Sequence, residues 1–101
     1  MNQTEERKIK EYLLKKHIKP NYSGYRYLID AIYLRSKDDY MLRIVKGLYQ
    51  DVGDIHNTTG SKVERGMRHA IFLAHKKIKE SCPTNSEFIA QAVLDLELGR
   101  F

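Results

Sequence analysis

A chain of 101 residues has room for one compact domain with a single hydrophobic core and not for two, so we expect one domain over residues 1–101. Hydrophobic residues make up 42% of the sequence and charged residues 31%, a balance that excludes a disordered chain, and no apolar run is long enough to span a bilayer. The net charge of +5 favours an anionic partner such as nucleic acid.

Helical periodicity recurs from end to end, without alternating strand patterns, and predicts an all-α fold of about five helices. The first helix is predicted over residues 4–17, with Thr4 or Asn2 as its cap and Pro20 beyond its end. Its apolar residues are few: Ile9, Tyr12, Leu13 and Leu14. We interpret its basic residues as a solvated face rather than a second DNA-contacting element: Arg7, Lys8, Lys10, Lys15 and Lys16.

A second helix follows the turn-prone segment PNYSG, because apolar residues then recur at helical spacing: Tyr25, Leu28, Ile29 and Ile32. Three further tyrosines surround this stripe and could stack on bases, but rings at the boundary of the core are the commoner explanation: Tyr22, Tyr27 and Tyr33.

A third helix is predicted after SKDD, with its end or a bend at Gly47 and with the apolar residues Met41, Leu42, Val45 and Leu48. A short fourth helix should then reach Asn57, a residue type that tolerates the left-handed conformation of a turn. Its apolar side is predicted to consist of Leu48 or Tyr49, Val52 and Ile55.

Residues 61–78 are predicted to form an amphipathic helix. At about 100° per residue, one arc is apolar and should be buried: Val63, Met67, Ala70, Ile71, Ala74 and Ile78. The other arc is polar and should face outward: Ser61, Lys62, Glu64, Arg65, Arg68, His69 and Lys76.

The segment TNSE predicts the start of the last helix, because Thr84 and Glu87 have the spacing of a capping box directly after Pro83. The apolar stripe of this helix should close the core: Phe88, Ile89, Ala92, Val93 and Leu96.

A short helix, a turn and a longer helix over residues 48–78 suggest a helix-turn-helix with its recognition helix over residues 59–78. Gly53, Asn57 and Val63 stand where such motifs commonly have a small residue, a turn residue and a core residue. The pattern departs from the motif at His56 and Gly66, two positions that are often apolar.

The outward arc carries residue types that read duplex DNA. Arginine can donate two hydrogen bonds to guanine, glutamate can accept from cytosine, and serine, lysine or histidine can bind phosphates near a helix N-terminus. Glu64 favours base reading, because a purely phosphate-binding surface gains nothing from a carboxylate. Alternatively, Glu64 pairs with Arg68 at i, i+4 and only stabilises the helix.

Several segments resemble the effector domain of the stage zero sporulation protein A family: HIK, GYRYLIDAI, GLYQDVGDIHNTT, SKVERGMRHAI and PTNSEFIA. The resemblance implies a helical transcription regulator that binds double-stranded DNA, as a homodimer or as tandem copies. It implies base contacts by Lys62, Glu64, Arg65 and Arg68, and phosphate contacts by Thr58, Thr59, Ser61 and His69. The family usually has arginine in place of Lys62, so the preference at one base pair is expected to differ.

The sequence departs from the family in two larger respects. The family protein carries a phosphorylated receiver domain that nothing in this chain encodes, so a complete chain would not be switched by phosphorylation directly. The connector HKKIKESC is shorter than in the family, where this region includes a segment implicated in contacting the RNA polymerase sigma subunit. These departures lead to the hypothesis of a stand-alone repressor, or of a competitor for the parent regulator's sites.

Other functions find less support. We expect no enzyme, cofactor or metal site, because Cys82 has no CxxC partner and HExxH spacing is missing among His17, His56, His69 and His75. The lone cysteine and the lack of a signal-peptide core favour a cytoplasmic protein. The main alternative is a protein-interaction module that kept the fold, with Phe72 and Leu73 as a contact patch; RNA binding is weaker still.

Overall fold

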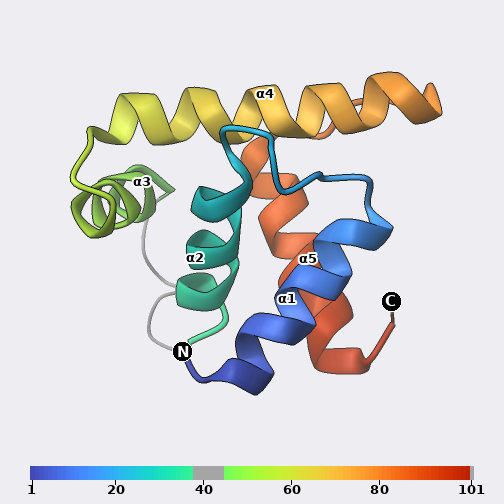
Figure 1. Ribbon diagram of the computed structural model, residues 1–101, viewed down its shortest axis with the longest axis horizontal. Coiled ribbons are helices and arrows are strands. Elements are labelled where there is room, and N and C mark those ends of the chain that lie inside the picture. The colour runs from blue at the N-terminus through green and yellow to red at the C-terminus, as the bar shows by residue number, and fades with distance from the viewer. Residues whose placement is uncertain (38–44, 101) are drawn as a thin grey trace.

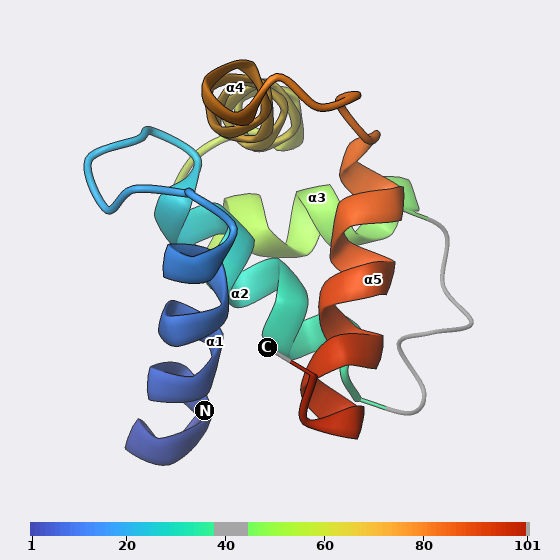
Figure 2. The same ribbon diagram turned by 90° about the vertical axis from the view of Figure 1, so that its right-hand side faces the viewer.

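The computed structural model describes residues 1–37 and 45–100, which form five α-helices and contain no strand. The helices are α1 (Gln3–Lys15), α2 (Tyr25–Arg35), α3 (Val45–Ile55), α4 (Gly60–Ile78) and α5 (Asn85–Leu98). Helices α1, α2 and α5 pack together, and α4 lies across one end of this bundle (Figure 1). Figure 2 shows α3 on the bundle side of α4. The predicted all-α fold is confirmed.

Two of the predicted helix starts carry capping boxes. The Asn2 side chain accepts a hydrogen bond from the Glu5 amide at 2.8 Å, and the Glu5 carboxylate accepts one from the Asn2 amide at 3.0 Å. Thr84 and Glu87 make the same reciprocal pair at the start of α5. Each box pairs backbone N–H groups that the helix itself leaves without a partner. Asn2, one of the two predicted candidates, is therefore the cap of α1.

The end of α1 and the extent of α3 differ from the predictions. Helix α1 ends at Lys15, two residues early, because His17 adopts a left-handed conformation (φ 67°). The predicted helix end at Gly47 is wrong, since α3 continues from Val45 through Gly47 to Ile55 as one helix. A glycine inside a helix costs only about 1 kcal/mol, less than the burial of neighbouring apolar side chains returns. The predicted Met41 and Leu42 lie outside the described residues.

The core draws on all five helices, and the predicted apolar stripes supply most of it. Two side chains predicted to be apolar contacts are exposed instead: Leu14 by 68% and Ile55 by 58%. Leu14 lies about 100° around α1 from Leu13, outside the arc that faces α2 and α5. Ile55 shares the arc of Leu48 and Val52, but it is the last residue of α3 and remains uncovered. The three tyrosines predicted at the core boundary are confirmed there: Tyr22, Tyr27 and Tyr33.

A buried polar contact ties α1 to α5. The Tyr12 hydroxyl donates a hydrogen bond to the Asp95 carboxylate at 2.8 Å, and the Gln91 amide donates a second one at 2.8 Å. Burial alone would raise the pKa of Asp95, but these two hydrogen bonds, with the charges of Lys16 and Arg100, lower it below its usual value. The folded protein therefore holds Asp95 as a carboxylate.

We expect Asp95→Asn to lower the free energy of unfolding at pH 7 by about 1 to 3 kcal/mol, because charged hydrogen bonds are replaced by weaker neutral ones. A lowered pKa in the folded state means that this stabilisation is complete above the usual value of 3.8 and is lost as the pH falls through the folded-state pKa. Urea unfolding of both proteins at a series of pH values measures the difference. A difference that stayed constant down to about pH 2 would contradict the expectation.

Candidate nucleic-acid interface

The turn between α3 and α4 depends on a glycine. The Thr58 amide donates a hydrogen bond to the Gly53 carbonyl at 2.8 Å, which folds the chain back on the end of α3. A Cβ atom on Gly53 would lie 2.8 Å from the Thr58 carbonyl oxygen, too close for any other residue without a backbone shift. Asn57 takes the left-handed conformation at φ 55°. The predicted roles of Gly53 as the small residue and Asn57 as the turn residue are thus confirmed.

Helix α4 begins directly after this turn. Thr59 is its N-cap, and its hydroxyl oxygen accepts a hydrogen bond from the Lys62 amide at 3.2 Å. The oxygen serves here as an acceptor, so the hydroxyl hydrogen can still be donated to another group. The remaining N–H groups of the first turn point out of the helix end, together with the positive end of the helix dipole. The start of α4 therefore offers hydrogen-bond donors to an anion.

The faces of α4 follow the predicted division. Val63 and Met67 are fully buried, as are Ala70, Ile71 and Ala74, while Ile78 is only half-buried. On the opposite side, most of the predicted site residues are exposed: Thr59, Ser61, Lys62, Arg65, Arg68 and His69. Thr58 and Glu64 are half-buried. The predicted residues therefore all belong to α4 or to the turn directly before it, and α4 lies across one end of the bundle (Figure 1).

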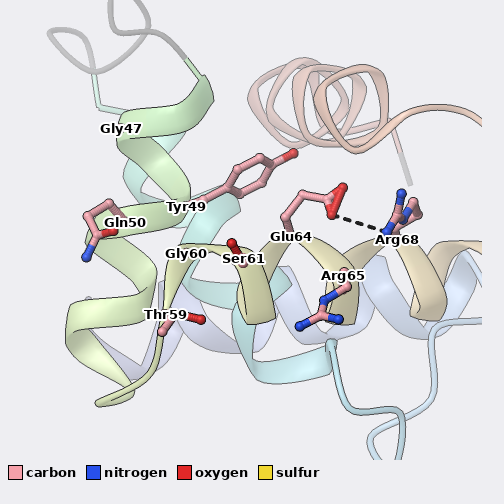
Figure 3. A pocket seen from close by; sticks show the side chains of 9 residues that line it. All are labelled: Gly47, Tyr49, Gln50, Thr59, Gly60, Ser61, Glu64, Arg65 and Arg68. Atoms are coloured by element: carbon pink, nitrogen blue, oxygen red, sulfur yellow. Dashed lines mark ion pairs between the residues drawn. The ribbon is translucent and has the colours of Figure 1, made fainter.

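Two of these residues form an ion pair along the helix. The Arg68 guanidinium lies 3.5 Å from the Glu64 carboxylate, with 64% of the Arg68 side chain and 33% of the Glu64 side chain exposed. Arg65 projects from the helix apart from this pair (Figure 3). In the described part of the chain, Arg65 has no carboxylate within ion-pair distance. Arg65 is thus the arginine of α4 whose donors are not engaged by any carboxylate of residues 1–37 and 45–100.

An open groove of about 970 Å³ runs between α3 and the first half of α4. Its lining comes from both helices, since Tyr49 and Gln50 belong to α3 while Ser61, Glu64 and Arg68 come from α4 (Figure 3). Burial raises the pKa of the Tyr49 phenol above its usual value, and the nearby Glu64 charge adds to this effect. The groove has a cationic side and hydrogen-bonding side chains from both helices.

Sequence reasoning missed two residues of this region. Asn85 is 93% buried, since only 7% of it is exposed, and its amide nitrogen donates to the Glu64 backbone carbonyl at 3.0 Å. It thereby joins the start of α5 to the second turn of α4. The sequence pattern predicts Tyr49 only as a core residue, whereas Tyr49 also lines the groove. Neither position could be recognised in advance, because both act through contacts between segments that lie far apart in the sequence.

The two departures from the motif have a common explanation in α2. The His56 ring contacts the Asp30 carboxylate. It also packs edge to face against the Tyr27 ring, with 5.1 Å between the two ring centroids. A Cβ atom on Gly66 would lie 3.2 Å from the same Tyr27 ring, so the tyrosine occupies the space of a side chain there. A ring supplied by α2 therefore replaces the apolar contacts that these two positions usually make within the motif.

The residues that the structure describes contain no group of three or more histidine, cysteine, aspartate or glutamate residues able to hold a metal ion. No helix in that part of the chain is long and apolar enough to cross a membrane.

Helix α3, its glycine-dependent turn and the amphipathic α4 together define a helix-turn-helix domain with a cationic outward face. The family described as "Sporulation initiation factor Spo0A C terminal" matches residues 9–96, so the chain belongs to this family. The predicted resemblance is confirmed over nearly the whole chain. The family is one of DNA-binding regulatory domains of sporulation.

The two glycines of α3 provide a matched test of the turn. Gly53→Ala should lower the free energy of unfolding by about 1 to 3 kcal/mol, because the new methyl group forces the backbone apart at Thr58. Gly47→Ala should raise it by about 0.5 to 1 kcal/mol, since a Cβ atom there meets nothing within 4 Å and alanine favours the helix. Urea unfolding measures both values, and a Gly53→Ala variant as stable as Gly47→Ala would refute the described turn.

Proposed function

We propose that this chain binds specific sequences of double-stranded DNA by placing α4 in the major groove, and that it regulates transcription by doing so. The observation that carries the proposal is Arg65, an exposed arginine near the middle of the outward face of α4 with no carboxylate partner in the described residues. An unpaired guanidinium in this position can donate two hydrogen bonds to the O6 and N7 atoms of guanine. The family of the chain supports the same partner.

The other proposed base contacts flank Arg65 along the same helix. Lys62 precedes it by one turn and is exposed, so its ammonium group can reach a base edge or an adjacent phosphate. Glu64 and Arg68 form the ion pair described above, which confirms the predicted pairing. The pairing does not exclude base reading, because about two thirds of the Arg68 side chain remains exposed at 64%. We propose that Glu64 holds Arg68 in an orientation suited to the groove.

The proposed phosphate contacts lie at the two borders of this face. Thr58, Thr59 and Ser61 surround the N-terminus of α4, where backbone N–H groups and the helix dipole favour an anion. His69 is exposed about one turn after Arg65 along α4, toward the C-terminal end of the helix. Contacts of this kind fix the position and register of a protein on the duplex, while contacts to base edges select the sequence.

A protein-interaction function is the second candidate, and one observation favours it. Phe72, 49% exposed, continues the outward face of α4 beyond Arg68 and His69. An apolar interface at Phe72 would be nearly insensitive to salt. DNA binding instead weakens steeply as the salt concentration rises, because the release of condensed counterions then gains less free energy. Lys62 and Glu64, in the turn of α4 that precedes Arg65, favour DNA, because interfaces between proteins are depleted of lysine and glutamate at their centres.

We propose further that the chain binds as tandem copies or a homodimer and that it represses rather than activates. The connector between α4 and α5 comprises only residues 79–84. The resemblance assigns the family's contact with the polymerase sigma subunit to a longer segment in this region. A chain that occupies the same sites without that segment would compete with an activator for them.

We expect Arg65→Ala to weaken binding to the best duplex by about 1 to 3 kcal/mol and to reduce discrimination at one base pair. The fold should be unaffected, because the Arg65 side chain is exposed. Fluorescence anisotropy with the best duplex and with single-base variants measures both effects. Arg7→Ala, which removes an exposed arginine of α1, is the matched control. Equal affinities of Arg65→Ala and Arg7→Ala for the best duplex would contradict the assignment.

Transcription in vitro tests the sign of regulation. Adding the protein to a promoter that contains its best site should decrease the transcript or leave it unchanged, since the connector lacks the length of the proposed sigma-contacting segment. Arg65→Ala protein should have a weaker effect at the same concentration. A reproducible increase that depends on Arg65 would show that the short connector still supports activation.

A further inference from the structure

Phe72 is an aromatic side chain on the outward face of α4. It is 49% exposed, whereas the other large hydrophobic side chains of this helix, which lies wholly within the described residues, are buried or half-buried. A single exposed ring is ordinary on a protein surface. The position of this ring on the helix and the side chains around it therefore decide whether it has a role.

The ring is aligned with Arg65 along α4. Phe72 follows Arg65 by seven residues, which at about 100° per residue brings it to within about 20° of the same line on the helix surface. Seven residues correspond to about 10.5 Å along the helix axis. Phe72 thus faces the same surface as Arg65, about two turns further toward the C-terminal end of the helix.

An open depression of about 470 Å³ joins Phe72 to residues that we propose as DNA contacts. Its lining consists of Phe72, Arg65, Arg68, His69 and Cys82, so none of the described residues around it is a carboxylate. Lys76, one turn after Phe72 along the helix, is exposed as well. The ring is therefore an apolar spot among basic side chains.

This combination fits the major groove of DNA better than a protein surface. The centre of a protein interface consists of many apolar side chains and is depleted of charge, and one ring between Arg68 and Lys76 does not supply such a centre. The phosphates that border a DNA groove match the basic side chains in charge. Within the groove, an A·T pair presents an apolar group, the C5-methyl group of thymine, and a phenylalanine ring can contact it.

We propose that Phe72 contacts the C5-methyl group of a thymine in the duplex whose major groove holds α4, and that this contact selects thymine at one position of the site. The inference rests on the proposed function and adds a specificity-determining residue to it. Cytosine is disfavoured at this position, because it lacks the methyl group and would place its N4 amino group against an apolar ring that accepts no hydrogen bond.

The spacing along α4 also predicts where this thymine lies. Base pairs are stacked about 3.4 Å apart, and a helix that follows the major groove runs obliquely to the stack. The separation of about 10.5 Å between Arg65 and Phe72 along the helix then corresponds to about two to three base pairs. The thymine is expected at that distance from the guanine that Arg65 contacts.

Duplexes in which deoxyuridine replaces thymidine at one position at a time test the inference, because this replacement removes only the methyl group. Fluorescence anisotropy with wild-type protein should show an affinity loss of about fourfold at the expected position, the factor that corresponds to the burial of one methyl group. Phe72→Ala should bind the thymidine and deoxyuridine duplexes equally. Phe72→Leu should keep part of the preference, since leucine also offers an apolar contact.

Leu14→Ala is the matched control, because it removes an exposed apolar side chain from α1, where Leu14 is 68% exposed. This variant should keep the full preference for thymidine. The preference is a ratio of two affinities of the same folded protein, so a change in the stability of a variant does not alter it.

The inference is overturned if wild-type protein shows no loss with deoxyuridine within about three base pairs of that guanine, or if the best site has no thymine there. It is overturned equally if Phe72→Ala keeps the full loss, which is the result expected when Phe72 contacts another protein and not the methyl group. The proposed function is tested separately. If Arg65→Ala loses discrimination at the guanine while deoxyuridine has no effect, only the Phe72 contact is wrong. If wild-type protein binds the best duplex and an unrelated duplex equally, the proposed sequence-specific function is wrong.

Discussion

The orientation of α4 depends on a backbone contact that only glycine permits. The start of α2 presses against the middle of α4 at Gly24, where any side chain would collide with the Gly66 carbonyl oxygen 2.2 Å away. This contact and the turn at Gly53 hold α4 by its backbone at two places, so its rotation is fixed by hard-sphere sterics. The buried arc then faces the bundle, and Arg65 faces outward as a consequence. A surface that reads base edges requires this rigidity, because its donors must be in place before the duplex arrives.

The helix-turn-helix of this chain is completed by an element outside the motif. Tyr27 of α2 contacts both His56, in the turn, and Gly66, in α4. Each of these residues alone weakens the motif, since histidine is polar and glycine has no side chain to bury. Together they accommodate one aromatic ring, and Asp30 supplies the polar partner of His56. The motif and α2 therefore form one packing unit. The sequence of the helix-turn-helix alone does not contain Tyr27, so His56 and Gly66 look like departures from the motif when it is considered by itself.

Periodicity and capping chemistry were sufficient to predict the helices and the buried arc of α4, because both depend on residues close together in the sequence. The continuation of α3 through Gly47 was not predictable in this way, since propensity there is overridden by tertiary burial. The same limit applies to the site. Spacing along one helix predicted which residues face outward, but not that Asn85 holds the Glu64 backbone or that the Tyr27 ring occupies the space beside Gly66. Those contacts join segments whose proximity only the folded chain establishes.

Selection of duplexes from a random pool by the purified protein tests the central claim most directly, namely that the outward face of α4 reads DNA sequence. The account predicts enrichment of a short shared motif that contains a guanine, because Arg65 is a bidentate donor on that face with no carboxylate partner among the described residues. The enriched motif should lose its preference at one base pair when the pool is selected with Arg65→Ala protein. Recovered sequences indistinguishable from the input pool, at a salt concentration where the protein is folded and binds DNA, would contradict sequence reading by α4.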